Sequence, residues 1–329
     1  MKKLSIFSTL VLVAFMLTGC DDDVISGKGT EKDPYTIATP KQLQQLAKEV
    51  NNGSDKAGLY YKLTDNINLN GFQSGNEWTP IGGQSRPFCG IFDGCGFVIS
   101  KLYFDIDGDH AGLFGMVKDG TVKNVGVIDS EVRAKGEVGG IVGHLDGSGK
   151  IENCYYLGNV DGNPNDRGLN VGGIVGYVDG SGKVSQCYAA GGRISGASNI
   201  GGIAGWINTN GSVSNCIAIN SKIELLKNAS YNAGRVAVPP NNVNTPNTSS
   251  TLSNNAAWSG MKVYSKPAVS GTVTGVHNDR HGKDASTAQI RTAAFFDTYL
   301  TDPIWTKENG RLPGFNGNTE KMSDHVPSN

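Results

Sequence analysis

The fold of this chain is decided by Gly140-Ile141-Val142-Gly143 and by Gly149-Lys150-Ile151-Glu152-Asn153-Cys154, which begins six residues later. The first element occurs four times, at spacings of 28, 33 and 29 residues, and the second follows it each time. The other copies of the first are Gly112-Leu113-Phe114-Gly115, Gly173-Ile174-Val175-Gly176 and Gly202-Ile203-Ala204-Gly205. Those of the second begin at Gly120, Gly182 and Gly211. A unit this short cannot bury its own apolar face, so successive copies must stack.

Each copy predicts one coil of a solenoid. Two short β-rich runs are separated by turn signals such as Asp146-Gly147 and Asp179-Gly180, and a variable loop supplies the third side. Parallel strands of stacked coils lie about 4.8 Å apart, and parallel crossovers favour the right-handed sense. We therefore expect an all-β fold, a right-handed parallel β-helix.

Side-chain alternation along the strands predicts which residues fill the core. Three columns are expected to point inward: Leu113, Ile141, Ile174 and Ile203; Val117, Leu145, Val178 and Ile207; and Val122, Ile151, Val184 and Val213. A fourth column, formed by Val125, Cys154, Cys187 and Cys216, lies three residues after the third. The inward phase must therefore change between these two columns.

A corner explains this change of phase. Asn124, Asn153, Gln186 and Asn215 occupy the position just before the fourth column. Amides at a bend can hydrogen-bond the backbone of the coils above and below, so we interpret them as a structural ladder without catalytic function. The cysteines recur with the repeat, which predicts buried thiols rather than disulfides.

Different structure is expected on either side of the repeats. Thr39-Pro40-Lys41-Gln42 is a capping box, and Leu43, Leu46, Ala47 and Val50 form one apolar stripe. These features predict a helix near residues 40–52 that covers the first coil. We assign residues 33–230 to the β-helix. The repeat fades after Ile223, so residues 231–329 are expected to form an irregular C-terminal cap that adds a strand or two to the last coils.

The N-terminus has the features of an exported lipoprotein. Lys2 and Lys3 precede an apolar run from Leu4 to Leu17 that is too short to span a bilayer, which predicts a signal peptide over residues 1–19. The run ends in Leu17-Thr18-Gly19-Cys20, which resembles a lipobox and predicts a diacylglycerol on Cys20. A plain secretory signal is the alternative. Residues 20–32 would form an acidic, flexible tether that begins with Asp21-Asp22-Asp23.

The charge balance limits the possible partners. Loss of Lys2 and Lys3 lowers the 29 basic residues to 27, against 30 acidic residues, for a net charge of −3. No basic block is present to collect phosphates, so a nucleic acid is not an expected partner. Membrane contact is expected only through the N-terminal lipid.

Four motifs together resemble proteins with the GLUG repeat. They are the Gly-Gly-Ile-Val-Gly elements, Asn153-Cys154-Tyr155, Phe92-Asp93-Gly94 and Trp78-Thr79-Pro80-Ile81-Gly82. The resemblance covers roughly residues 33–235 and, more loosely, Trp305 to Pro313. It implies an adhesin-like surface lipoprotein of Bacteroides-like bacteria, although the same repeat also occurs beside the peptidase domain of some IgA-cleaving metalloproteases. A shared fold does not supply function.

Metal chemistry has little support in the sequence. The His-Glu-x-x-His motif of zinc peptidases is absent, and the nearest approach, His277 to His281, has Asn278 in place of the glutamate. The other histidines, His110, His144 and His325, are isolated in the sequence. Asp105-Ile106-Asp107-Gly108-Asp109 fails the spacing of a calcium loop and is interpreted as a polar turn. We expect no metal and no cofactor.

Catalytic residues are not apparent either. The position of Glu152 holds Lys123, Ser185 and Ser214 in the other copies, so no column of carboxylates forms. Glycoside cleavage would require two carboxyl groups about 5 to 9.5 Å apart in an open groove. We therefore expect no enzyme activity.

One feature is a candidate binding surface. Met116, His144, Tyr177 and Trp206 share one repeat position and are expected to form an outward stripe, of which His144, Tyr177 and Trp206 could bind a ligand. The expected outward face also carries Phe114, Val142, Val175 and Ala204. Exposed apolar patches are uncommon unless they are used, so residues 231–329 could instead cover this stripe. The shorter pair Tyr155 and Tyr188 has the same two interpretations.

These observations favour a cell-surface lipoprotein of the outer membrane. We expect it to bind a glycan, or a protein of a host or neighbouring cell, through its β-helix surface. A carbohydrate-active or other degradative accessory protein is the main alternative. A purely structural component of the envelope is the third.

Overall fold

The computed structural model describes residues 24–71, 78–162, 170–208, 210–228, 233–239, 252–266 and 279–327. The predicted signal peptide, the lipobox with Cys20, Asp21-Asp22-Asp23 and His277 lie outside these residues. No helix within the described ranges is long and apolar enough to cross a membrane.

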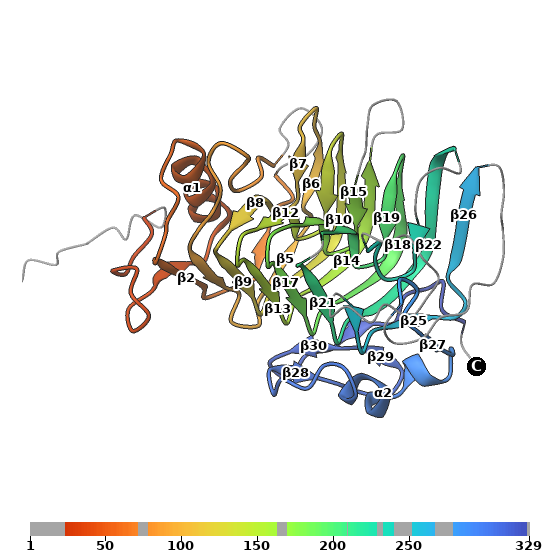
Figure 1. Cartoon of the computed structure of the whole chain (residues 1–329). Coiled ribbons are helices and arrows are strands. Elements are labelled where there is room, and N and C mark those ends of the chain that lie inside the picture. Colours follow the sequence, from red (N-terminus) through yellow and green to blue (C-terminus); the bar gives the residue numbers. More distant parts are fainter. Residues whose placement is uncertain are drawn as a thin grey trace, which may run out of the picture.

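The described chain winds into a parallel β-solenoid, as predicted (Figure 1). Sheet 1 contains β1 (Tyr35–Ile37), β2 (Tyr60–Leu63), β4 (Ile91–Asp93), β9 (Thr121–Lys123), β13 (Lys150–Glu152), β17 (Lys183–Ser185), β21 (Ser212–Ser214) and β24 (Leu252–Ser253). Sheet 2 contains β3 (Ile67–Asn68), β5 (Val98–Ser100), β6 (Tyr103–Asp105), β10 (Gly126–Ala134), β14 (Tyr155–Gly162), β18 (Tyr188–Gly196), β22 (Ile217–Asn228), β25 (Ala256–Trp258), β26 (Lys262–Lys266) and β27 (Lys283–Ala285).

Two shorter sheets complete each coil. Sheet 3 contains β8 (Phe114–Lys118), β12 (Val142–Asp146), β16 (Val175–Val178) and β20 (Ala204–Ile207). Sheet 4 contains β7 (His110–Ala111), β11 (Glu137–Gly139), β15 (Asn170–Gly172), β19 (Asn199–Gly201) and β23 (Ala233–Gly234). One coil therefore runs from β10 through β11 and β12 to β13 before the chain reaches β14, directly beside β10.

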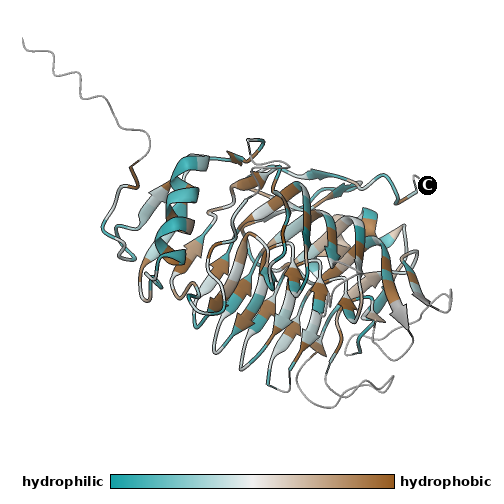
Figure 2. Cartoon of the chain, turned by 90° about the horizontal axis from the view of Figure 1, so that it is seen from above, coloured by the Kyte–Doolittle hydropathy of each residue, from teal (hydrophilic) through white to brown (hydrophobic). Residues whose placement is uncertain are grey.

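The predicted core columns are confirmed: the side chains point inward at the positions that alternation along the strands indicates. All twelve residues of the three predicted inward columns are fully buried, as are Val125 and the three cysteines of the fourth column. Figure 2 shows hydrophobic residues in bands across neighbouring strands. Each band repeats the same apolar position from coil to coil, so every coil buries the apolar face of its neighbours.

The predicted outward position of Phe114, Val142, Val175 and Ala204 is wrong, because all four side chains are fully buried. The Phe114 ring lies 5.1 Å from that of Phe88 and 5.2 Å from that of Phe92, inside the core. A glycine bend explains the error. The pairing of β12 with β16 omits Gly143, and Val142 is fully buried while His144 is partly exposed, so these two side chains do not share a face. A Cβ on Gly143 would lie 2.5 Å from the backbone nitrogen of Ala111, which leaves no room for another residue.

The predicted corner ladder is confirmed. Asn124, Asn153, Gln186 and Asn215 all have left-handed φ values between 51° and 56°, and Asn254 continues the series in the next coil with 48°. Asparagine tolerates this backbone region better than most residues. The Nδ2 of Asn153 donates to Oδ1 of Asn124 at 3.1 Å, and that of Asn254 donates to Oδ1 of Asn215 at 2.7 Å.

The cysteines form no disulfide among the described residues, and Cys154, Cys187 and Cys216 are fully buried thiols. The backbone nitrogen of Cys154 donates to Sγ of Cys187 at 3.4 Å. Asn255 takes the next position of the column, where its Oδ1 accepts from the Cys216 nitrogen at 2.9 Å. A buried amide thus ends the thiol column with its polar groups paired.

Helix α1 (Pro40–Asn51) lies at the N-terminal end of the solenoid, as predicted (Figure 1). Thr39 and Gln42 form both halves of the capping box, and Leu43, Leu46, Ala47 and Val50 are buried. The side chain of Asn51 donates to the Pro80 carbonyl at 3.0 Å and accepts from the Gly82 nitrogen at 2.8 Å. The helix is therefore attached to the chain that leads into the first regular coils.

The strand ladder continues past residue 230, where we placed the start of an irregular cap. β23 pairs with β19, Ala237 bridges to Ala204, and β27 pairs with β25. The remaining chain contains a 3₁₀ turn (Gln289–Arg291), α2 (Ala293–Asp297) and strands β28 (Trp305–Thr306), β29 (Arg311–Leu312), β30 (Gly314–Phe315) and β31 (Glu320–Lys321). These elements lie together along one side of the solenoid (Figure 1). We call residues 286–327 the C-terminal strap.

Candidate functional site

The predicted stripe is in register on sheet 3. Met116 pairs with His144, His144 with Tyr177, and Tyr177 with Trp206. Met116 is buried, whereas His144, Tyr177 and Trp206 are half-buried. The His144 and Tyr177 rings lie 4.7 Å apart. Three of the four side chains thus keep part of their surface open to a ligand.

A polar ladder on sheet 4 accompanies this stripe. His110 pairs with Glu137, Glu137 with Asn170, and Asn170 with Asn199. Their neighbours in sequence, Ala111, Val138, Val171 and Ile200, are fully buried, so the ladder occupies the opposite, outer face. Asn199 Nδ2 donates to Asn170 Oδ1 at 2.8 Å.

The stripe on sheet 3 and the polar ladder on sheet 4 meet at Glu137. Its Oε2 lies 2.5 Å from Nδ1 of His110 and 3.7 Å from Nδ1 of His144. The two imidazole rings are 5.4 Å apart and close to perpendicular, at 70°. Exposure of the three side chains is only 11 %, 17 % and 13 % for His110, Glu137 and His144. We call these three residues the histidine–glutamate cluster.

The prediction that His110 and His144 are isolated is therefore wrong. His110 stands directly beside Glu137 of the next coil, and the glycine bend at Gly143 brings His144 back toward the same carboxylate. The repeat alignment conceals this pairing, because it matches Gly112 with Gly140 and therefore His110 with Val138, one residue away from Glu137. The strand register of β7 and β11 is shifted by one residue from the repeat spacing, so alignment of the repeats alone does not find the pair.

The charges around the cluster are acidic. Burial alone would raise the pKa of Glu137, but its contacts with the two imidazoles outweigh burial and lower that pKa to about 2. Asp146 and Asp179 each place a carboxylate oxygen within 4.8 Å of a His144 ring nitrogen. Lys118 pairs with Asp146 at 3.1 Å. Three carboxylates therefore surround His144.

Tyr177 connects this acidic group to the rest of the stripe. Burial raises the pKa of Tyr177 to about 12, and the nearby carboxylates of Asp179 and Glu137 add to the rise. Burial also acts to raise the pKa of Asp179, but hydrogen bonds from Asn208, Gly180 and Tyr177 lower it overall. The phenol therefore stays protonated and the carboxylate ionised at neutral pH.

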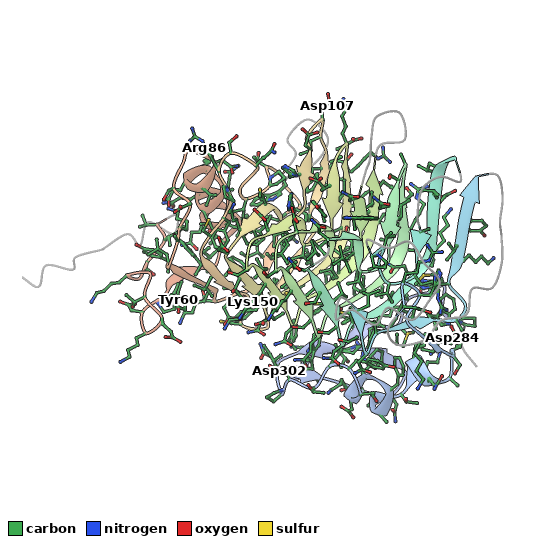
Figure 3. All side chains as sticks on the ribbon, in the orientation of Figure 1. Tyr60, Arg86, Asp107, Lys150, Asp284 and Asp302 are labelled. Carbon is green, nitrogen blue, oxygen red and sulfur yellow. The ribbon has the colours of Figure 1, made fainter. Side chains whose placement is uncertain are left out.

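Two sets of side chains among the described residues have the composition and spacing of metal ligands. His110, Glu137 and His144 form one set, and His144, Asp146 and Asp179 form the other, with all ligand atoms of a set within 4.8 Å of one another. Asp105 and Asp107, from the polar turn considered for calcium, instead contact Arg133 and Lys135 (Figure 3, where Asp107 is labelled). His281 is buried against Arg280 and Arg235.

The C-terminal strap covers the other aromatic pair. Tyr155 and Tyr188 are fully buried, with Trp305 and Phe315 of the strap packed around them. Thr301 and Asp302 anchor it to the corner ladder, since both backbone nitrogens donate to Oε1 of Gln186, at 2.7 and 2.9 Å. The described contacts of the strap are thus with Tyr155, Tyr188 and the corner. The region from 231 to 329 includes residues outside the described ranges, so coverage of the stripe stays an open prediction.

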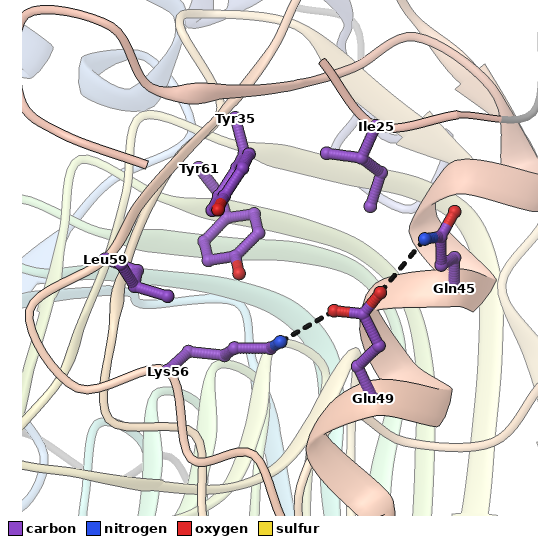
Figure 4. A pocket seen from close by; sticks show the side chains of 7 residues that line it. All are labelled: Ile25, Tyr35, Gln45, Glu49, Lys56, Leu59 and Tyr61. Atoms are coloured by element: carbon purple, nitrogen blue, oxygen red, sulfur yellow. Dashed lines mark hydrogen bonds and ion pairs between the residues drawn. The ribbon is translucent and has the colours of Figure 1, made fainter. Parts of the chain in front are cut away.

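Other pockets lie elsewhere among the described residues, and two of them include a glutamate. One, of about 140 Å³, is lined by Ile25, Tyr35, Gln45, Glu49, Lys56, Leu59 and Tyr61 beside α1 (Figure 4). Glu49 accepts from Lys56 at 2.6 Å and from Gln45 at 2.9 Å, so its charge is already satisfied. The other, of about 380 Å³, lies between sheet 2 and the strap and includes Phe97, Phe315 and Glu320. Glu320 accepts from the Tyr155 hydroxyl at 2.7 Å.

Comparison with known proteins supports the fold. A crystal structure described as a "putative immunoglobulin A1 protease" from Bacteroides ovatus superposes with a TM-score of 0.66, at 23 % identity, over 89 % of this chain and 95 % of that chain. At this identity the likeness shows a shared solenoid fold alone. No family model matches the chain, so the resemblance to GLUG-repeat proteins rests on the quoted motifs.

Two curated relatives share part of the sequence. A "Putative Gly-rich membrane protein" of Evansella cellulosilytica is 29 % identical over 133 residues, and the halomucin of Haloquadratum walsbyi is 33 % identical over 149 residues. These alignments cover 39 % and 42 % of this chain, but only 15 % and 2 % of the relatives. The matched segment is thus a small part of much larger proteins.

Proposed function

We propose that this protein is a lipid-anchored β-helix of the bacterial outer membrane that binds a glycan along the stripe formed by His144, Tyr177 and Trp206. The observation that carries the proposal is the combination of two registered columns, half-buried rings on sheet 3 and polar side chains on the outer face of sheet 4. Rings offer flat apolar surfaces to sugar faces, while amides and carboxylates can pair with hydroxyl groups. Solenoids commonly bind along such extended surfaces.

Surface display is supported from two directions. Leu17 to Cys20 has the pattern of a lipidation site, followed by three aspartates. The relatives are called a Gly-rich membrane protein and a halomucin, and the structural neighbour comes from Bacteroides ovatus. All of these names fit an envelope or extracellular setting.

A glycan and mucin array with the purified chain tests the proposal. Trp206→Ala and Tyr177→Ala should each weaken binding by about 5- to 30-fold, because loss of one ring–sugar contact costs on the order of 1 to 2 kcal/mol. Tyr60→Ala is the matched control, since Tyr60 is also half-buried but lies on β2 near the N-terminal end (labelled in Figure 3). Unchanged binding with a lowered melting temperature in the stripe variants would contradict the proposal.

A glycan-cleaving enzyme is the second candidate, and Asp146 with Asp179 is the observation that favours it. Their carboxylate oxygens come within 4.8 Å of each other, near the separation used by retaining glycosidases. However, a general acid needs a raised pKa, and that of Asp179 is lowered. Asp146 and Asp179 also accept hydrogen bonds from Gly147 and Gly180 within their own turns. Release of reducing sugar by the wild type but not by Asp179→Asn would support the enzyme instead.

A further inference from the structure

The histidine–glutamate cluster contains four buried imidazole nitrogens, and the Glu137 carboxylate is the ion-pair partner of the two Nδ1 atoms alone. Both ring nitrogens of His110 and both of His144 are buried, and none makes a hydrogen bond. The 2.5 Å approach of Glu137 to His110 is thus an ion-pair contact without hydrogen-bond geometry. Burying polar groups without partners costs free energy, so the two Nε2 atoms, which have neither a hydrogen bond nor an ion-pair contact with Glu137, require an explanation.

The cluster is also a local departure from the repeat. In the following coils the position of Glu137 is held by Asn170 and Asn199, and that of His144 by Tyr177 and Trp206. Asn170 and Asn199 satisfy each other by a hydrogen bond. The coil can therefore be built without ligand-type side chains at these positions, and the fold does not require two histidines and a glutamate there.

We propose that His110, Glu137 and His144 bind a zinc ion. Two imidazole nitrogens and one carboxylate oxygen are a common ligand set for zinc in proteins, and zinc sites with three protein ligands leave a fourth position for water or another ligand. Calcium is disfavoured because it takes six to eight oxygen ligands. In tetrahedral geometry, zinc-to-ligand lengths of about 2.0 to 2.2 Å place ligand atoms roughly 3.4 Å apart. The observed separations of 2.5 and 3.7 Å bracket that value, and all three ligand atoms lie within 4.8 Å of one another.

The surrounding charge supports a cation at this place. Glu137 contacts both imidazoles, and Asp146 and Asp179 place two further carboxylates beside His144. We choose the set with Glu137 over the set with Asp146 and Asp179 because those two carboxylates already accept hydrogen bonds. Asp146 accepts from Gly147, and Asp179 accepts from Gly180 and Asn208.

Zinc titration of the purified full-length chain, prepared with a tag that lacks histidine, tests this site. We expect one equivalent of Zn²⁺ to bind with micromolar or tighter affinity and to raise the melting temperature, as any ligand of the folded state does. Cobalt(II) at the same site should give the strong visible bands of a four-coordinate ion without a thiolate charge-transfer band. Such a thiolate band, or the absence of stoichiometric binding, would overturn the proposal.

Three variants are designed from the repeat itself so that they fold. His110→Asn and Glu137→Asn introduce the residue found at Asn170 and Asn199, and His144→Met introduces that of Met116. Each should weaken zinc binding by at least about 100-fold, since even loss of an outer partner of a ligand costs 10- to 100-fold. Their melting temperatures without metal should stay near that of the wild type, and zinc should no longer raise them.

Asp179→Asn and His325→Gln are the matched controls. Asp179 belongs to the competing ligand set, and His325 lies outside the cluster, where its Nε2 contacts the Ile219 carbonyl at 2.8 Å. His325→Gln should bind zinc as the wild type does, and Asp179→Asn should weaken binding by no more than about tenfold, because it removes only a neighbouring charge. If Asp179→Asn abolishes binding while Glu137→Asn retains it, the proposed ligand set is wrong. The readout is metal binding, so the result is independent of whether the stripe binds a glycan.

Discussion

The rings of Tyr155 and Tyr188, one coil apart on sheet 2, stack with centroids 5.1 Å apart and planes within 5° of parallel. The Tyr188 hydroxyl donates to the Pro313 carbonyl at 2.5 Å, and the Tyr155 hydroxyl donates to Glu320. Trp305 lies 6.0 Å from the first ring and 5.7 Å from the second. The stack is thus the place where the C-terminal strap is attached to the side of the solenoid.

Removing the Trp305 ring should detach the strap. Trp305 is 5 % exposed, and truncation of a buried Trp to Ala costs about 3 to 5 kcal/mol. We expect the Trp305→Ala variant to become sensitive to proteases within residues 286–327 at temperatures where the coils stay folded. Tyr60→Ala, which removes a half-buried ring far from the strap, should leave the protease pattern unchanged. Equal sensitivity of the two variants would argue against this attachment.

Two substitutions of the corner residue Asn153 measure separately how backbone strain and side-chain hydrogen bonds contribute to the free energy of unfolding. Its φ is 52°, and its Nδ2 donates to Asn124 and to Asp302 of the strap, both at 3.1 Å. Asn153→Ala should lower the free energy of unfolding by about 2 to 3 kcal/mol, because alanine is strained in the left-handed region and cannot make the two side-chain hydrogen bonds. Asn153→Gly removes the strain and should recover about 1 kcal/mol of this. Chemical denaturation measures both, and identical losses would refute a role for strain.

Stability should fall in mild acid because of His281. Burial, and then the charges of Arg280 and Arg235, lower its pKa to about 3, while the Asp279 side chain accepts from its backbone nitrogen. In the unfolded chain the imidazole takes up a proton below its ordinary pKa of about 6.5, but in the folded chain it stays neutral until about 3. The stabilisation is therefore complete above pH 6.5 and declines as the pH falls.

The expected size of this decline is about 2 kcal/mol between pH 7.5 and pH 5, from roughly 1.4 kcal/mol per pH unit below 6.5. Denaturation midpoints at the two pH values measure it. In the His281→Asn variant most of the difference should disappear. A variant that keeps the full wild-type pH dependence would show that another group is responsible.

Lipid attachment at Cys20 is testable without the structure. Cys20→Ala should prevent incorporation of labelled palmitate, leave the signal peptide uncleaved by the lipoprotein peptidase, and move the protein out of the outer-membrane fraction. Asp22→Asn retains the lipobox and serves as the control for expression. Normal membrane fractionation of unlabelled Cys20→Ala would mean that the chain is held there by other contacts.

Much of the fold could be predicted because each apolar position is repeated. Four aligned copies revealed the inward columns and the corner at Asn153, and the capping box located α1. The face of Val142 was wrong because alternation assumes a regular strand, while Gly143 bends against Ala111 of the preceding coil. The meeting of His110, Glu137 and His144 depends on that same bend. The coils continue through β23 to β27, further than the expected strand or two, because these strands keep the pairing without keeping the glycine pattern.

The thiol column at Cys154, Cys187 and Cys216 requires these coils to fold before their cysteines are oxidised. A disulfide forms only through a thiolate, and burial raises the pKa of Cys187 well above its usual value, so this thiol resists disulfide formation in the folded coil. The same thiols are ordinary and reactive while the chain is still extended. In an oxidising compartment, folding of these coils therefore competes with disulfide formation between exposed thiols. Faster folding leaves a larger fraction of the chains correctly folded.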